Sequence, residues 1–498
     1  MNDITAFFAF LRYCLGYKRN MSKIVAGMDW QGLYSFASKQ ALLGLCFEGI
    51  ERLGKEYPEE LRLNPIGREL LMTWMGKAQQ IRRQNMKVNA VAGKLFSMLR
   101  EDGLRCCVLK GQGNALMYPN PYSRTPGDID VWVNASRERI MGYTSKKFEL
   151  GDDIRLQHLE TSLDGVPVEL HFFPCSMNNP IYHARLQKWF RRNADLQCSH
   201  IVGLPDGAGD IAIPTMAFNV IYQLTHLYHH FFDEGIGMRQ IIDYYHVVCD
   251  FYKVYQNSSK ITPSLFTIKE GSTSHPDPLT LRGEGGNRPT RCSEPLRSKD
   301  GGPSKVSPDC AGWDRLTERV GDRLGDSLGE GLGDRLDAIG DMTSASTDTS
   351  ATAARSSFAA GSSSAASSIT SVSSASTTDF SASTAFDVVL RDLKYLGLWK
   401  FAGAVMFVMK EVLGLSEEKM IAPMDEKRGK LLLAEILDGG NFGRHFSKYG
   451  GFTHQSMGKK YFLKIWRNMH FVRYYPAEAL CEPIFRTWHF FWRLKHRR

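Results

Sequence analysis

The segment GDIDVWV, residues 127–133, places two aspartates two positions apart in a stretch that otherwise favours a buried strand. Because side chains alternate along a strand, Asp128 and Asp130 share one face with Trp132, while the other face is wholly apolar. The apolar face suits a core, but two neighbouring carboxylates repel each other unless a cation holds them. Carboxylate oxygens are ligands that Mg²⁺ and Mn²⁺ prefer. The segment therefore predicts a divalent-metal site on a small sheet, and an exposed strand charge or a turn is the alternative.

Two nearby segments extend this pattern. VPVELHFF (166–173) alternates in the same way and places Glu169 and His171 on the face opposite its apolar side chains. Glu169 can therefore supply a third metal ligand or act as the general base for an attacking hydroxyl. CVLKGQG (107–113) predicts a strand that ends in a glycine-containing turn before a helix, where backbone N–H groups and Lys110 can contact phosphate.

The periodicity of apolar residues predicts an α+β protein, with a small mixed sheet embedded in a mainly helical chain. Segments from 104 to 174 are short, β-rich and separated by turn residues, with a helix expected at 112–118. The flanking sequence repeats apolar residues every three or four positions, as amphipathic helices do. We therefore divide the chain into an N-terminal helical region (1–100), an α/β core (101–200), a helical region (201–255), an insertion (256–385) and a C-terminal helical region (386–498).

The insertion differs in composition from the rest of the chain. Pro, Gly, Ser and charged residues dominate 263–308, and Ser, Ala and Thr make up nearly all of 343–384. Neither segment carries enough apolar side chains to offset the entropy that folding would cost. Between them, apolar residues recur every four positions from Leu316 to Leu336, but interior glycines weaken any helix there. We therefore expect 256–385 to be disordered.

Composition also limits the class of protein. The chain has 498 residues, 43% of them hydrophobic, so it can fill a sizeable core. Its ten cysteines are dispersed without a CxxC pair, which favours a reduced, intracellular protein. The N-terminus lacks the pattern of a signal peptide, and the longest apolar run, 401–409, is about half of what a spanning helix needs. We therefore expect a soluble, cytoplasmic protein without a transmembrane segment.

The net charge of +9 is concentrated at the C-terminus. Residues 459–498 contain ten Lys or Arg but only two carboxylates, Glu478 and Glu482, and they also contain many aromatic residues. This mixture suits a nucleic acid, a nucleotide or an anionic membrane surface. A helix pair whose aromatic residues form a core and whose charges are solvated is the alternative.

VLKGQGNALMYPNPYSRTPGDIDVWV (108–133), followed by VPVELHF (166–172), resembles the uncharacterised bacterial nucleotidyltransferase family of the DNA polymerase beta superfamily. The shared features are a Lys-Gly turn, a Tyr-Pro, an Arg shortly before Asp-Ile-Asp, and a later Glu-Leu-His. LTHLYHHFFDEGIGMRQIIDYYHVV (224–248) is similar to the helical half of that family. The resemblance covers about residues 25–250, extends loosely to the C-terminal helices and excludes the insertion.

The resemblance implies an enzyme that uses Mg²⁺ or Mn²⁺ to transfer a nucleoside monophosphate from an NTP to an acceptor by two-metal chemistry. Asp128 and Asp130 would bind the metal ions, and Glu169 would be the third ligand or the base. Lys110 and Gly111 would contact phosphate, at a position where the wider superfamily usually has Gly-Ser or Gly-Gly.

Several residues have more than one possible role, and several properties of the protein stay open. Arg124 would either contact phosphate or brace the aspartates. His226 and His230 share a helix face at i, i+4, but without an HExxH pattern we expect packing or substrate contact rather than a metal site. Arg239 and Asp243 have the same spacing and predict a helix-surface or interdomain pair that can line the cleft. The acceptor, which can be a small molecule, a protein or a nucleic acid, stays open, as do the NTP and the oligomeric state.

Two other classes of function also remain open. The first is a catalytically inactive nucleotide-binding module with a regulatory role, which the presence of all three carboxylates disfavours. The second is a protein that binds RNA or a membrane surface through its basic C-terminus, for which steep salt dependence of RNA binding would be a sign.

Overall fold

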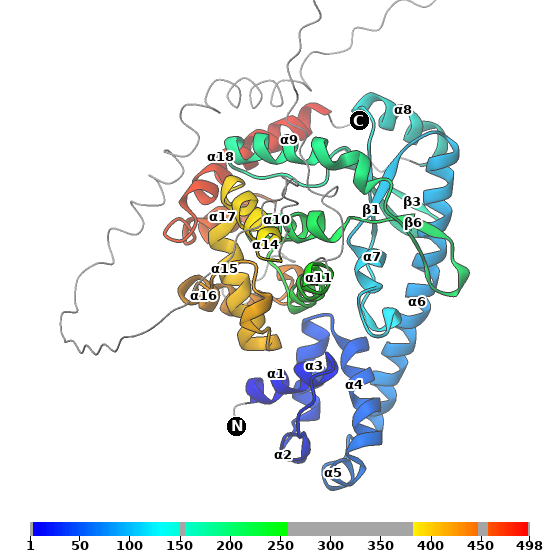
Figure 1. Cartoon of the computed structure of the whole chain (residues 1–498), viewed down its shortest axis with the longest axis vertical. Coiled ribbons are helices and arrows are strands. Elements are labelled where there is room, and N and C mark those ends of the chain that lie inside the picture. Colours follow the sequence, from blue (N-terminus) through cyan, green and yellow to red (C-terminus); the bar gives the residue numbers. More distant parts are fainter. Residues whose placement is uncertain (1–2, 150–154, 257–381, 447–456, 497–498) are drawn as a thin grey trace, which may run out of the picture.

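The computed structural model describes residues 3–149, 155–256, 382–446 and 457–496 (Figure 1). Residues 257–381, almost all of the predicted insertion, lie outside this described part. A small mixed sheet is embedded in helices, which confirms the predicted α+β fold.

The main sheet has four strands in the order β1-β2-β4-β3. Their bounds are β1 (Cys106–Leu109), β2 (Ile129–Val133), β3 (His158–Leu163) and β4 (Val166–His171). β2 pairs parallel to β4 and places Asp130 beside Glu169, while β1 and β3 pair antiparallel on the two outer sides. A second, two-stranded antiparallel sheet consists of β5 (Ile201–Gly203) and β6 (Asp210–Ala212). The parallel register therefore brings together two carboxylate residues from separate motifs.

Helices make up most of the described chain, including the regions predicted to be helical on both sides of the sheet. The helices up to α11 are α1 (Asp3–Cys14), α2 (Ser22–Ala26), α3 (Trp30–Lys39), α4 (Leu43–Glu56), α5 (Pro58–Leu63), α6 (Arg68–Glu101), α7 (Gly111–Ala115), α8 (Arg137–Lys147), α9 (Pro180–Gln197), α10 (Met216–Asp233) and α11 (Met238–Gln256). The helices after the insertion are α14 (Ala382–Tyr395), α15 (Trp399–Val408), α16 (Glu426–Gly439), α17 (Met457–Met469) and α18 (Pro476–His496). Short 3-10 or π segments are η1 (Pro121–Ser123), η2 (Pro205–Gly207), η6 (Met409–Leu413), η7 (Glu417–Lys419) and η8 (Asn441–Gly443).

Apolar side chains cover both faces of the main sheet. On one face, Val131 and Leu170 share a core with Leu95 of α6. On the other face, Trp132 stacks on Phe218 of α10, with ring centroids 6.1 Å apart. The strand β2 is buried along its whole length, and its Val and Ile residues suit such a strand. The predicted alternation is thus confirmed, and the face that carries Asp130 is covered by helices as well.

One continuous core joins the N-terminal helices to the helices that follow the insertion. It contains Phe10 of α1, Leu45 of α4, Phe231 of α10 and Phe401 of α15. In Figure 1 the C-terminal helices lie beside α10 and α11, which they follow only after the long insertion. The segments before and after the insertion therefore fold together.

Only some of the aromatic side chains in the basic C-terminal segment are buried in a core. Phe471 and Tyr475 are buried, as a helix pair with an aromatic core predicts, whereas Phe462 and Trp466 are 72% and 63% exposed.

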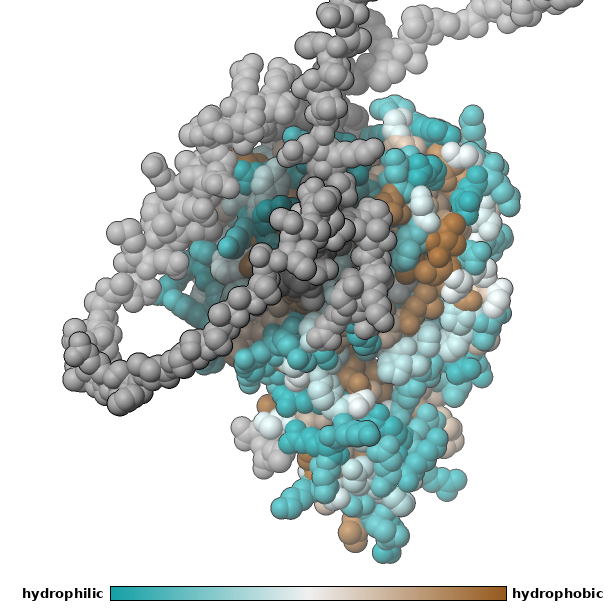
Figure 2. Space-filling view, viewed as in Figure 1, coloured by the Kyte–Doolittle hydropathy of each residue, from teal (hydrophilic) through white to brown (hydrophobic). Residues whose placement is uncertain are grey.

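On the face seen in Figure 2, the surface over the N-terminal helices is mostly hydrophilic. No helix in the described ranges combines the length and the apolar character needed to cross a membrane.

Two glycine-containing turns pack directly against each other. We call residues 440–444 the C-terminal turn, and it lies against the turn between α10 and α11. Gly443 has φ +62°, and a Cβ at this position would collide with the carbonyl oxygen of Glu234. A Cβ on Gly237 would lie 2.7 Å from Cα of Asn441. The two backbones are in contact, so only glycine fits at these positions.

Gly443→Ala should lower the free energy of unfolding by roughly 2–4 kcal/mol, because a Cβ is strained at this φ and has no room. Gly76→Ala is the matched control: it lies in α6, where a Cβ would meet nothing within 4 Å, so it should stabilise by about 0.5–1 kcal/mol. Urea denaturation of both variants measures the difference. Equal stability of Gly443→Ala and the wild type would show that this contact is not formed.

A buried ion pair joins the segment before β2 to α11. Arg124 donates from Nε and Nη2 to the two carboxylate oxygens of Asp243, each at 2.8 Å. Both side chains are almost fully buried, and Tyr118 donates a further hydrogen bond to Asp243 at 2.8 Å. Burial raises the pKa of Asp243, but Arg124 outweighs it and holds that pKa below its usual value. The predicted direct pair of Arg239 with Asp243 is wrong, because Arg124 from another segment binds the carboxylate, but both residues line the smaller cavity as predicted.

Asp243→Asn should lower the free energy of unfolding by about 3–5 kcal/mol, because it leaves Arg124 buried without its counter-charge. The control is Asp195→Asn, which removes the exposed pair that Asp195 forms with Arg105 at 2.6 Å and should cost less than about 1 kcal/mol. Chemical denaturation compares the two. If both substitutions have the same small effect, the Arg124 pair contributes little to the fold.

Candidate functional site

Three carboxylates converge at the start of β2 and on β4. Asp130 and Glu169 are register partners on the parallel strands, and Asp128 lies directly before β2. Asp128, Asp130 and Glu169 each offer one oxygen within 4.8 Å of the others. Asp130 is buried, whereas Asp128 is exposed. The fold thus brings together the three carboxylates that the two motifs contribute.

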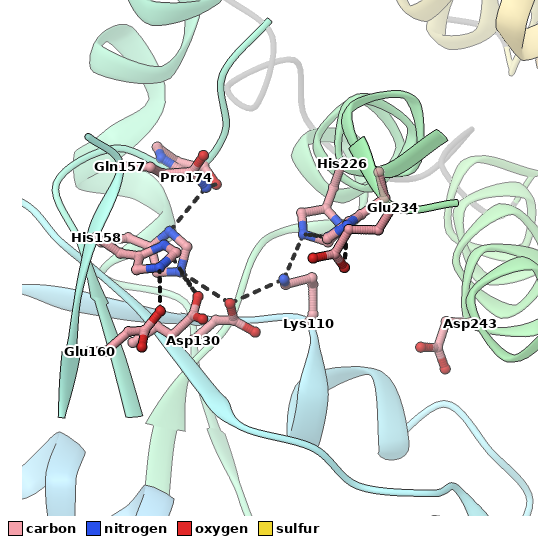
Figure 3. A network of polar contacts seen from close by, with 12 residues as sticks. Lys110, Asp130, Gln157, His158, Glu160, Pro174, His226, Glu234 and Asp243 are labelled. Atoms are coloured by element: carbon pink, nitrogen blue, oxygen red, sulfur yellow. Dashed lines mark hydrogen bonds and ion pairs between the residues drawn. The ribbon is translucent and has the colours of Figure 1, made fainter. Parts of the chain in front are cut away.

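Lys110 supplies a counter-charge to this group. Its Nζ lies 3.1 Å from Oδ1 of Asp130 and 2.7 Å from Nε2 of His226 (Figure 3). Burial raises the pKa of Asp130, but Lys110 and then His171 outweigh it and hold that pKa below its usual value. Lys110 has φ +54°, which is strained for a residue with a side chain. Gly111 follows with φ +44° and opens α7.

The carboxylates still carry an excess of negative charge. The charge of Asp130, and then burial, raise the pKa of Asp128 to about 6, although Lys110 acts in the opposite direction. A divalent cation among the three carboxylates would relieve this repulsion. The donor set consists of hard oxygen atoms, which Mg²⁺ and Mn²⁺ prefer. Asp128, Asp130 and Glu169 therefore fit as ligands of such an ion.

His171 orients two of the carboxylates. Its Nε2 lies 3.0 Å from Asp130 Oδ1 and 3.2 Å from Glu169 Oε2. The amide nitrogen of Gln157 donates to the carbonyl of Pro174 at 3.0 Å and lies 3.2 Å from Nδ1 of His171. Because a carbonyl can only accept, this contact fixes the Gln157 amide and makes Nδ1 an acceptor. The Nε2–H of His171 therefore donates to the carboxylates.

Protonation of His171 would disturb this arrangement. Burial lowers the pKa of His171, but its hydrogen bonds to Asp130 and Glu169 outweigh burial and raise the pKa to about 9. A proton on Nδ1 would, however, require the amide of Gln157 to turn away. Of the two neutral tautomers, the one with its proton on Nε2 satisfies every polar contact of the ring.

His158 is a neighbour that the sequence analysis did not single out. It lies on β3 opposite His171, and its Nδ1 is 3.3 Å from Oε2 of Glu169. His158, Glu169 and His171 offer ligand atoms within 4.8 Å of one another. The alternation of LQHLETSL would have placed His158 on the carboxylate face, since β3 is the strand next to β4.

His226 and His230 lie on one face of α10, as predicted. Their Nε2 atoms are 3.0 Å apart, and His226 also faces the ammonium group of Lys110. Burial, and then Lys110, lower the pKa of His226 well below its usual value, so the ring is neutral and accepts from Lys110. Within the described residues, no third side chain completes a metal-binding group with these two histidines.

Arg239 is a buried cation beside the carboxylates. It is 8% exposed, and its Nη1 donates to the carbonyl of Thr125 at 3.0 Å. Its Nε has no hydrogen-bond partner, and no carboxylate of the described part forms an ion pair with it. Burial, and then the nearby Arg124, lower the pKa of Arg239. The carboxylates of Asp243 and Asp128 act on Arg239 without a direct ion pair, so this buried guanidinium is suited to bind an anion.

Two adjoining cavities border these residues. The larger has a volume of about 790 Å³ and the smaller about 60 Å³. Side chains common to both are Lys110, Asp128, Asp130, His226 and Phe442. The smaller cavity also contacts Arg239, and the larger contacts Glu169. Anion-binding and cation-binding groups therefore open onto one connected region.

The carboxylates and their neighbours lie in a segment that matches a known family. Residues 26–256 match the model of a family described as an uncharacterised nucleotidyltransferase. No curated protein and no solved structure matches the chain. The matched segment includes the three carboxylates, the Lys-Gly turn and Arg239, and it ends before the C-terminal turn. The family and the acidic group both point to nucleotidyl transfer. Residues 26–256 therefore match the uncharacterised nucleotidyltransferase family that the motifs of the chain resemble, which confirms the predicted resemblance.

Proposed function

We propose that the protein transfers a nucleoside monophosphate from an NTP to an acceptor in a reaction that depends on Mg²⁺ or Mn²⁺. The observation that carries this proposal is the convergence of Asp128, Asp130 and Glu169 beside a cavity of about 790 Å³. These carboxylates would hold the metal ions, which when bound neutralise phosphate charge and stabilise the charge that develops during transfer.

The cations of the site bind the phosphates. Lys110 projects from the strained turn before Gly111 toward the carboxylates, and Arg239 borders the same region without a counter-ion. Charge on these groups favours departure of pyrophosphate when the acceptor oxygen attacks the α-phosphorus and the bond to the β-phosphate breaks. Arg124 acts indirectly: by binding Asp243 it holds α11, and with it Arg239, beside the aspartates.

Glu169 is either the third metal ligand or the base that accepts the proton of the acceptor hydroxyl. Burial raises the pKa of Glu169, but the hydrogen bond from His171 outweighs burial and lowers it, so the carboxylate is ionised. An ionised carboxylate suits both roles. The presence of the full set of carboxylates, with their counter-charges, disfavours an inactive nucleotide-binding module.

NTP binding should be much tighter with Mg²⁺ or Mn²⁺ than with a chelator, and Asp128→Asn should abolish this difference. Because Asp128 is repelled by Asp130, its neutralisation should leave the fold intact or stabilise it. Titration calorimetry with each of the four NTPs measures the effect. Asp164→Asn, in the exposed pair with Lys94, is the control and should bind like the wild type. Wild-type binding that is indifferent to metal would refute the proposed metal site.

Glu169→Gln keeps the shape of the side chain but removes its charge and basicity. If Glu169 is the base, turnover should fall roughly 10²–10⁴-fold while metal-dependent NTP binding stays nearly intact. If it is a ligand, metal binding should weaken as well. Incubation with labelled NTPs and a cell extract identifies the molecule that gains label and provides the assay. Unchanged binding and turnover would remove Glu169 from the site.

A further inference from the structure

Phe442 lies at the junction of the two cavities, in a strained backbone conformation. Its φ is +54° and its ψ is 33°, values that residues with side chains rarely adopt. The side chain is only partly buried, and it lines both cavities. Strained residues persist where the surrounding structure imposes them, and they concentrate at ligand sites.

The packing of the C-terminal turn imposes this conformation. Gly440 and Gly443 flank Phe442 with φ +64° and +62°, and Gly443 is pressed against the carbonyl of Glu234. Cα of Asn441 lies against Gly237. The turn therefore cannot relax without leaving the α10–α11 turn, and it holds the ring of Phe442 at the cavity.

The surroundings of Phe442 are almost entirely polar. It is the one Phe, Tyr or Trp that lines the larger cavity in the described part of the chain. The guanidinium of Arg239 lies 5.4 Å from its ring centroid, and the ring of His230 lies 5.3 Å away in an edge-on arrangement. Arg444 of the same turn also lines the larger cavity, where its charge acts on Glu234 without a direct ion pair between these described residues.

An aromatic ring beside Arg239 and Arg444, neither of which forms a direct ion pair among the described residues, fits a ligand that combines a flat, apolar surface with negative charge. A nucleotide has this combination, because its base presents a π-face and its phosphates are anionic. Inorganic phosphate or a sugar phosphate would use the cations but would have no contact that requires the ring.

We propose that the C-terminal turn forms the base-binding wall of the nucleotide site, with Phe442 as the surface on which the nucleobase stacks. This inference rests on the proposed function and adds the residue that contacts the base. The turn lies outside residues 26–256, so this part of the site comes from the segment that follows the insertion.

The test compares ATP with inorganic tripolyphosphate, both with Mg²⁺, because only ATP has a base to stack. Phe442→Leu keeps the apolar bulk but loses the aromatic face, so affinity for ATP should fall roughly 5- to 100-fold while affinity for tripolyphosphate stays unchanged. Phe442→Tyr should retain the affinity for ATP. Phe442→Asn, which tolerates the positive φ, gives the same comparison if the leucine variant does not fold.

Two further variants make the comparison specific. Arg239→Lys should weaken the binding of both ligands, because it alters a phosphate contact. Trp466→Leu, which removes an exposed aromatic residue that does not line the cavities, should change neither. The proposal is overturned if Phe442→Leu leaves ATP binding unchanged, or if it weakens both ligands equally, since the ring would then act only by positioning Arg239. A wild-type protein that binds neither tripolyphosphate nor any of the four NTPs would instead refute the proposed function itself.

Discussion

The parallel pairing of β2 with β4 is the constraint on which the candidate site depends. It sets Asp130 beside Glu169 on a sheet whose two faces are both covered by the rest of the chain. Two carboxylates this close, one of them fully buried, require compensation, which Lys110 provides by its charge and His171 by hydrogen bonds. A slip of one residue in either strand would turn its carboxylate toward the apolar core at α6. The electrostatics of the site and the packing of the sheet therefore enforce the same register.

Compensation of these charges also ties the sheet to the helices. Lys110 reaches both Asp130 and His226, so α10 is linked to the carboxylates through one ammonium group. Arg124 reaches Asp243 and fixes α11 at the same end of the sheet. As a result Arg239 is buried without a direct ion pair to a carboxylate of the described part, and a bound anion would compensate its charge. The site thus lies between the sheet and the helical half of the chain.

Residues that follow the insertion complete this region. Gly443 and Gly237 allow two backbones to touch, and this contact brings Phe442 to the cavities next to the carboxylates. The shared core of α10 and α15 shows why the contact is possible: the helices on either side of residues 257–381 fold as neighbours (Figure 1). The long insertion therefore separates these helices in the sequence without separating them in the fold.

The sequence by itself determined the α+β fold, the two faces of β2 and β4, and the carboxylates, because alternation and helical periodicity depend on neighbours a few residues apart. It could not determine the partners of those charges. Spacing predicted that Arg239 pairs with Asp243, yet Asp243 binds Arg124, which lies 119 residues away. Likewise, nothing local to Phe442 relates it to Asp128. Contacts between distant segments are decided by the packing of the whole chain, and only the tertiary structure shows which charges are compensated and which remain for a ligand.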